Sequence, residues 1–286
     1  MTSEKIYKFF GNRDFDLDAF AGSYLWFSGV KDFNDPFEGL YREQIKFRCG
    51  SELTDDEAMI YLMESNIFDG LSNEAASEKV LSDLAKFNNP FKHQKKFIAT
   101  ALKEATVRTL DLIEKERFCC CFIRDYHDNS ALNNKLMWSH YANGLRGFAL
   151  EFETDSLSDS FDSNNSFKTQ GGIVSYRNLK VVDNYKIMID WLKGKTDSGV
   201  ISVVLTKSPE WEYEQELRII ADTNKVYYDS SSIKSIVLGQ KMAKEKLNTL
   251  MAVIHSLGLT SKVKVAIIDR KTFNLSIVDF DEGLFE

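Results

Sequence analysis

The sequence has no long apolar run and contains few prolines and glycines. No stretch approaches roughly eighteen consecutive apolar residues, the length that indicates a membrane-spanning helix. Three prolines and fifteen glycines among 286 residues are too few for a fibrous or disordered chain. The opening segment MTSEKIYKFFGNRDFD lacks the basic and apolar regions of a secretion signal. We therefore expect a globular, cytoplasmic protein with no membrane partner.

The sequence also lacks an excess of basic residues and any C-x-x-C spacing. Lys and Arg number 36 against 43 Asp and Glu, so the formal net charge is −7, which argues against a protein that coats nucleic acid through a broad basic surface. The four cysteines are Cys49, Cys119, Cys120 and Cys121. Three adjacent cysteines in a strand cannot all point the same way, so we expect buried thiols rather than a zinc site or a disulfide framework.

The order of the predicted elements is that of an α+β protein. Runs rich in aromatic and β-branched residues predict strands over 4–10, 24–28, 117–123, 146–153, 171–177, 200–206, 232–239 and 262–268. Helical spacing predicts helices over 16–22, 136–144, 183–194 and 241–257. The polar segment 154–172 is predicted to be a disordered loop. We expect a single α+β domain over residues 1–286.

Residues 51–117 differ in composition from the rest of the chain. Glu, Ala, Lys and Leu dominate this block, and Thr54 precedes three acidic residues, as at the start of a helix. A break at 87–93 separates two helical segments. We interpret residues 51–117 as a helical insertion within the domain and as a candidate surface for a regulatory partner.

The segment KSPEWEYEQELRII (207–220) has the highest density of charged and aromatic side chains. As an extended strand it would place Glu212, Glu214 and Glu216 on one face, where the carboxylates repel each other unless cations, a ligand or solvent compensates. As a helix it would form an ordinary i,i+4 pair between Glu214 and Arg218. The first alternative gives an acidic site at the mouth of a sheet, and the second gives a solvated surface.

Two further clusters combine polar and aromatic residues. In DFNDPFEG, Asn34 and Asp35 form either a structural turn or a ligand-facing loop after a predicted strand. In MWSHYANG, Trp138 and Tyr141 lie three residues apart on one helical face, and His140 is either a packing residue or an acid or base. The sequence contains no P-loop, G-x-G-x-x-G or H-E-x-x-H motif, and no metal ligand is predicted.

Taken together and in this order, these segments resemble a bacterial family known as domain of unknown function 2971. The matching segments are IYKF (6–9), FSGVKDFNDPFE (27–38), MWSHYANGLRGFALEFE (137–153), VSYR (174–177), KSPEWEYEQELRII (207–220) and IKSIVLGQ (233–240). They cover most of the chain outside the helical insertion. The chain is therefore identified as a member of this family, whose name implies no activity.

The layout is also similar to that of ADP-ribosyltransferases, especially the toxin type that modifies DNA bases. In those proteins a first strand carries a basic residue after Tyr, a second strand ends near Ser or Thr, and a catalytic Glu opens a late strand. The corresponding positions in this sequence are Tyr7–Lys8, Phe27–Ser28 and Glu214-x-Glu216. The resemblance implies an ADP-ribosyltransferase-like mixed or antiparallel sheet core with a helical insertion.

The same resemblance implies an NAD-consuming transferase or glycohydrolase, of the kind found among bacterial toxins and phage-defence effectors. NAD would be the substrate, and a nucleic acid or a protein would be the acceptor. Glu216 would be the catalytic carboxylate, and Glu214 would position or deprotonate the acceptor. The residues implied to contact NAD are Tyr7, Lys8, Ser28, Asn34, Trp138, Tyr141 and Arg218.

Two other functions remain open from the sequence. A metal-dependent nuclease would use Asp35, Glu214 and Glu216 as carboxylate ligands. A non-catalytic binding module would use the same motifs only to hold the sheet together. In that case, replacement of Glu214 or Glu216 would unfold the protein rather than abolish an activity.

Overall fold

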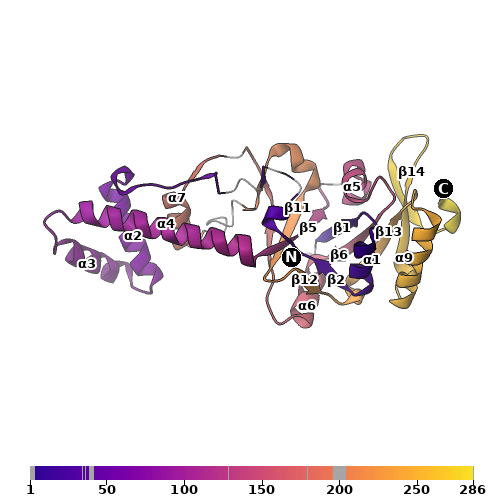
Figure 1. The fold of residues 1–286 in the computed structure, drawn as a ribbon, viewed down its shortest axis with the longest axis horizontal. Helices are drawn as coiled ribbons and strands as arrows, with labels where there is room; N and C mark the ends of the chain where they lie inside the picture. Colours follow the sequence, from indigo (N-terminus) through magenta and orange to yellow (C-terminus); the bar gives the residue numbers. More distant parts are fainter. Residues whose placement is uncertain are drawn as a thin grey trace. The chain divides into compact units, whose positions relative to one another are not determined.

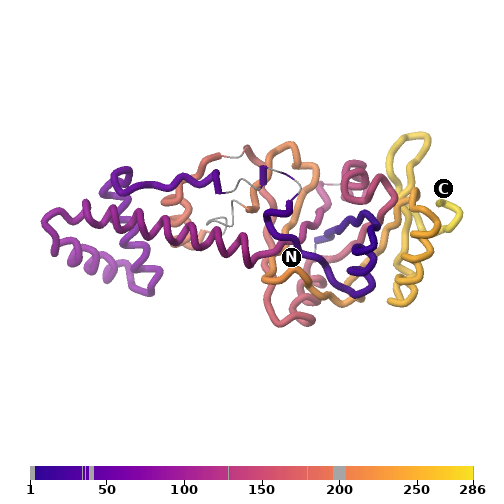
Figure 2. Tube along the Cα trace, viewed as in Figure 1, coloured from indigo at the N-terminus to yellow at the C-terminus, as the bar shows by residue number. Residues whose placement is uncertain are grey.

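The chain forms two compact units, whose paths can be followed by colour along the Cα trace (Figure 2). The computed structural model describes residues 4–33, 35, 37–38, 42–127, 129–178, 180–195 and 204–285. Unit 1 consists of Met1–Gly29, Arg117–Tyr176 and Pro209–Glu286, and unit 2 of Val30–Glu116 and Arg177–Ser208. Nearly all of the predicted helical insertion thus lies in unit 2, where it is joined by residues 177–208.

Nine strands form one mixed sheet in the described part of unit 1. Their order is β15 (Leu275–Asp279), β14 (Val263–Ile268), β13 (Ile233–Gly239), β6 (Phe148–Glu153), β1 (Lys5–Phe10), β5 (Phe118–Arg124), β11 (Glu216–Ala221) and β7 (Gln170–Ile173), with β3 (Ser28–Gly29) also pairing with β5. Strands β13 and β14 are parallel and are joined by helix α9 (Lys244–Ser256), whereas the other pairs in the sheet are antiparallel. Strands from both ends of the sequence meet in one sheet, so the α+β class is confirmed.

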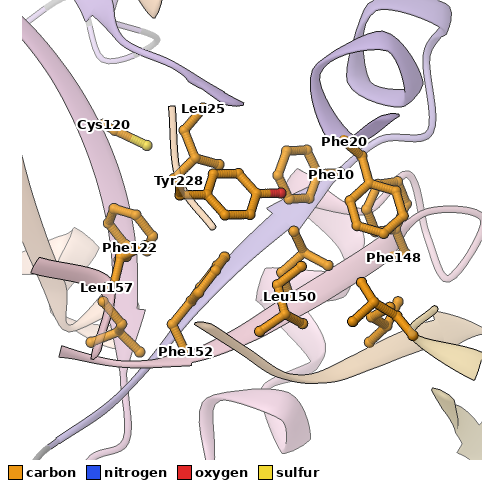
Figure 3. Close-up of a cluster of buried hydrophobic side chains, with 14 of the residues drawn as sticks. Phe10, Phe20, Leu25, Cys120, Phe122, Phe148, Leu150, Phe152, Leu157 and Tyr228 are labelled. Atoms are coloured by element: carbon orange, nitrogen blue, oxygen red, sulfur yellow. The ribbon is translucent and has the colours of Figure 1, made fainter. Parts of the chain in front are cut away.

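One face of this sheet, the α9 face, carries the larger hydrophobic core (Figure 3). Helices α1 (Asp14–Ala21), α6 (Thr154–Asn164) and α9 contribute to it. Its buried aromatic residues include Phe10, Phe20, Phe122, Phe148, Phe152 and Phe161. Because side chains alternate between the two faces of a strand, the residues next to Phe10 on β1, Phe122 on β5, and Phe148 and Phe152 on β6 point to the opposite face.

The opposite face of the sheet, the α5 face, is covered by helix α5 (Lys135–Tyr141). Here Tyr7, Phe9 and Ile123 of the sheet pack in one cluster with Met137 and Trp138 of α5. The helix begins where the Asn134 side chain accepts hydrogen bonds from two backbone amides, at Leu136 and Met137. The MWSHY motif is therefore helical, as predicted, and lies directly over the sheet.

Unit 2 is built mainly from α2 (Asp55–Phe68), α3 (Asn73–Leu84), α4 (Pro90–Glu116) and α7 (Asn184–Leu192). Helices α2, α3 and α4 lie side by side in Figure 1. The Thr54 hydroxyl accepts a hydrogen bond from the Glu57 amide, and the Glu57 carboxylate accepts one from the Thr54 amide. This capping box confirms the helix start that the sequence predicts after Thr54, which is the start of α2.

The remaining elements are short. Strands β2 (Tyr24–Trp26) and β12 (Lys225–Tyr227) pair with each other, as do β4 (Ile45–Lys46) and β9 (Val182–Asp183). The other bounds are β8 (Ser175–Tyr176), β10 (Thr206–Lys207), and the 3₁₀ helices η1 (Val30–Asp32), η3 (Gly50–Glu52), η4 (Ala131–Asn133), η5 (Pro209–Glu214), η6 (Ser230–Ser232), η7 (Thr260–Lys262) and η8 (Glu282–Leu284).

Two local predictions are wrong. The segment predicted as a disordered loop over 154–172 contains helix α6, because Leu157 and Phe161 lie one turn apart and both enter the α9-face core. The thiol of Cys49 is exposed rather than buried, whereas Cys119 and Cys120 are buried as expected. The strand predicted over 200–206 falls largely outside the described residues.

Candidate functional site

A row of side chains crosses the α5 face of the sheet. Tyr7 of β1 lies opposite Glu151 of β6 and opposite Ile123 of β5. Glu151 in turn lies opposite Ser235 of β13, and Ile123 lies opposite Glu216 of β11. Because directly opposed residues share a face, strand register brings one tyrosine and two carboxylates from distant parts of the sequence to the same side of the sheet.

Glu216 opens β11 and forms a buried ion pair with Arg218 two residues later on the same strand. Arg218 donates from Nε and Nη2 to Oε2 of Glu216, both at 2.7 Å, and the two residues are 3% and 1% exposed. The backbone amide of Glu216 also donates to the phenol oxygen of Tyr176 at 2.7 Å. The two charge-assisted bonds from Arg218 fix the orientation of the Glu216 carboxylate.

Glu214 is held by the helix that carries the MWSHY motif. The Tyr141 hydroxyl donates to Oε1 of Glu214 at 2.6 Å, and Glu214 is 0% exposed. This bond joins residues 73 positions apart in the sequence. Two of the motif segments found in the sequence are thus parts of one three-dimensional arrangement.

The prediction that Glu212, Glu214 and Glu216 share one strand face is wrong, and so is the alternative of one continuous α-helix. Helix η5 ends at Glu214, and β11 begins at Glu216. Gln215 between them has φ 46°, in the left-handed region that non-glycine residues rarely adopt. Because of this turn, side chains do not alternate regularly from Glu212 to Glu216. Glu212 is exposed, whereas Glu214 and Glu216 are buried.

The structure does not bring Lys8 to the α5 face with Glu216. Tyr7 shares the face of Glu216 and donates its hydroxyl to Asp125 at 3.2 Å, whereas Lys8 alternates to the other side of β1. The Lys8 ammonium donates to the backbone carbonyl of Cys121 at 3.1 Å. Burial raises the pKa of Tyr7 well above its ordinary value, so this phenol stays protonated and acts as a donor.

Two other residues implied to contact NAD, Ser28 and Trp138, have different surroundings. Ser28 of β3 lies opposite Cys119 and is half-buried. Trp138 is fully buried, donates from Nε1 to the carbonyl of Leu132 at 2.8 Å, and packs edge-on against Phe9. Its indole is therefore part of the core under α5. Asn34 lies outside the described residues.

Glu151, in the centre of the row, was not a candidate from the sequence. Burial acts to raise the pKa of its carboxyl, but hydrogen bonds from Lys5 and Ser235 outweigh burial, and the pKa is lowered below its ordinary value. The carboxylate is therefore charged at neutral pH. The segment FALEFE places Glu151 between apolar residues in the interior of a strand, and this is the signal that could have identified it.

A cavity of about 490 Å³ lies beside this arrangement, between the loop that follows β5 and the turn that precedes β11. We call it the β5–η5 cavity. Its wall consists of Ile123, Arg124, Tyr126, Asn129, Ser130, Ala131, Asn133, Asn134, Glu212, Tyr213 and Gln215. The residues on both sides of Glu214 thus line the cavity. These loop residues were not predicted from the sequence, although the polar run DYHDNSALNN after a strand was a signal for a ligand-facing loop.

Unit 2 contains a larger groove, of about 1010 Å³, along helix α4. Basic side chains in its wall include Lys96, Lys103 and Arg108. Among the described residues, no three His, Cys, Asp or Glu side chains are grouped closely enough to hold a metal ion. The same residues include no helix that is long and apolar enough to cross a membrane.

Comparison with protein families gives a match to part of the chain. Residues 137–219 match the model of a family described as Protein of unknown function (DUF2971). The matched region contains Tyr141, Glu214, Glu216 and Arg218, which form the two buried carboxylate contacts. No curated protein and no solved structure matches the chain.

Proposed function

We propose that this chain, a member of the DUF2971 family, is an NAD-consuming enzyme of the ADP-ribosyltransferase type. The proposal extends to the sheet, for which we infer an ADP-ribosyltransferase-like core. The observation that carries the proposal is the Tyr141–Glu214 hydrogen bond. It joins the MWSHYANG and KSPEWEYEQELRII motifs beside the Glu216–Arg218 pair, within residues 137–219, which match the family model and are called the family region below. A family signature that converges in space on two buried carboxylates is more typical of a reaction centre than of a solvated surface.

The chemistry requires few groups. The bond between ribose C1′ and the nicotinamide nitrogen breaks, the electron pair leaves with nicotinamide, and positive charge develops on the ribose. A carboxylate already fixed in orientation stabilises that charge without reorganising, which is the role proposed for Glu216. Glu214, hydrogen-bonded to Tyr141, would position or deprotonate the water or acceptor group that forms the new bond to C1′. The acceptor would be a nucleic acid or a protein.

One observation favours a second candidate, a non-catalytic binding module. Both carboxylates are buried and each has a hydrogen-bonding partner within the same chain. A buried ion pair that loses one partner leaves an uncompensated charge, which strongly destabilises the fold. In this alternative the motif glutamates would stabilise unit 1, and binding would reside elsewhere on its surface.

The test is nicotinamide release from NAD by the purified full-length chain, measured by chromatography. Glu216→Gln is compared with the wild type and with Glu245→Gln, which alters an exposed carboxylate on α9. The enzymatic proposal expects release by the wild type and by the control, and a loss of about two to three orders of magnitude in Glu216→Gln. No release by the wild type, or equal release by Glu216→Gln, would refute it. A large drop in the melting temperature of Glu216→Gln without any wild-type release would support the binding module.

A further inference from the structure

The β5–η5 cavity has the size and preformed walls of a small-molecule site. Its volume of about 490 Å³ lies within the range of roughly 300–1,000 Å³ that is usual for ligand pockets. The walls are held by hydrogen bonds. Asp125 accepts the Ala131 amide at 2.8 Å, and the Asn134 side chain donates to the Tyr213 carbonyl at 2.9 Å. A site fixed in advance loses less entropy when a ligand binds.

We propose that this cavity binds the base of a nucleoside or nucleotide. The residues of its wall include two tyrosines, Tyr126 and Tyr213, and each is at least partly exposed. Proteins that recognise unstacked bases place them against aromatic faces of this kind.

The polar edge of a base would meet two side-chain amides, those of Asn129 and Asn133. Asn129 and Asn133 line the cavity, both are exposed, and neither side chain makes a hydrogen bond within the described residues. Each amide presents a donor and an acceptor side by side, which matches the adjacent acceptor and donor groups along the edge of a base. A sugar ring is puckered and has no planar π-face to stack on the tyrosines, so a base fits both features of the wall better.

The charge of the wall also favours an uncharged group. The cavity has one guanidinium, Arg124, whose Nη1 donates to Glu4 at 3.1 Å, and one carboxylate, Glu212, which is exposed. The two charges balance, so the wall offers no excess of positive charge for a phosphate. The buried Nε of Arg124 has no hydrogen-bond partner in the described part of the chain, and a base oxygen or ring nitrogen that drew the guanidinium inward would supply one.

Backbone strain supports a ligand role for the same walls. His127 and Gln215 both have left-handed φ angles, 51° and 46°, and they flank or line the cavity. Such conformations persist only where the surroundings hold them, and they concentrate at ligand-binding turns. Base binding at this cavity does not depend on NAD cleavage at the buried carboxylates.

The experiment is calorimetric titration of the full-length chain with adenosine, guanosine, cytidine and uridine, alongside ribose. Variants are Tyr126→Ala, Tyr126→Phe and the control Tyr227→Ala. Tyr126 and Tyr227 are 46% and 44% exposed, but Tyr227 lies on β12, outside the wall of the cavity. We expect saturable binding of at least one nucleoside, weakened about tenfold by Tyr126→Ala but changed less than about twofold by Tyr126→Phe and by Tyr227→Ala.

Each other outcome overturns the proposal. No nucleoside binding at millimolar concentration excludes a base site, and ribose binding as tightly as the nucleosides shows that the sugar is recognised instead. Unchanged affinity in Tyr126→Ala, with an unchanged melting temperature, places the ligand elsewhere. Further titrations with NAD and with a single-stranded oligonucleotide distinguish a free nucleotide from a nucleic acid as the source of the base. Nicotinamide release is a separate measurement, so failure here leaves the NAD proposal intact.

Discussion

Removal of the Tyr141 hydroxyl tests whether the family region is held together by its buried tyrosine–glutamate bond. Tyr141→Phe leaves the ring in the α5-face core and removes the hydroxyl that donates to Glu214. Glu214 is 0% exposed, so the substitution leaves its carboxyl group without this donor in a buried site. A buried acceptor that loses its donor costs about 1–3 kcal/mol, and we expect a loss in the upper part of that range, about 2–3 kcal/mol, in the free energy of unfolding.

Differential scanning calorimetry and urea titration measure this loss. For a unit of this size, 1 kcal/mol corresponds to roughly 2–4 °C, so the expected fall in the melting temperature of unit 1 is about 4–12 °C. Because the chain has two compact units, the transition of each is followed separately in the scan.

The matched control is Tyr126→Phe, which removes a hydroxyl from an exposed ring. It should change the free energy of unfolding by less than about 0.5 kcal/mol. If Tyr141→Phe is as mild as this control, the Tyr141–Glu214 bond does not hold η5 against α5. The contact between the two motifs would then not stabilise the fold, and a reaction centre could not be inferred from it.

Three further predictions concern stability, pH and thiol chemistry. Ser235→Ala should lower the free energy of unfolding at pH 7 by about 1.5–3 kcal/mol, because it removes a donor to the Glu151 carboxylate; the effect is measured by urea titration from pH 7 to 3. Trp138→Ala should cost about 3–5 kcal/mol by opening a cavity in the core, measured in the same way. In the native protein, maleimide should label Cys49 first and spare Cys120, which is buried and whose pKa burial raises to about 11.

The pH dependence of the Ser235→Ala effect has a definite sign. The folded-state pKa of Glu151 lies below the ordinary value of 4.5, so its stabilising contribution is complete above 4.5 and disappears as the pH falls through the folded pKa. The difference between wild type and Ser235→Ala should therefore shrink on acidification. A difference that stays constant down to pH 3 would contradict this assignment. Labelling of Cys120 as fast as Cys49, or a Trp138→Ala protein as stable as the wild type, would contradict the other two.

The positions of most strands and helices could be predicted from local patterns, but the geometry at 207–220 could not. Both alternatives drawn from that segment assumed one regular repeat, whereas Gln215 adopts a left-handed conformation that separates η5 from β11. No local preference of glutamine predicts this turn. It is held by contacts from elsewhere in the chain, including the Arg124 amide, which donates to the Gln215 carbonyl at 3.1 Å.

The sequence alone determined the α+β class, the capped start of α2 and the family signature, because these depend on side-chain periodicity and on short motifs read in order. Only the tertiary structure decided which motif residues meet. Strand register set Tyr7 beside Glu151 and on the face of Glu216, while alternation along β1 sent Lys8 to the other face. Pairing between strands far apart in the sequence is fixed by the packing of the whole sheet, so the site could not be assembled from its motifs one at a time.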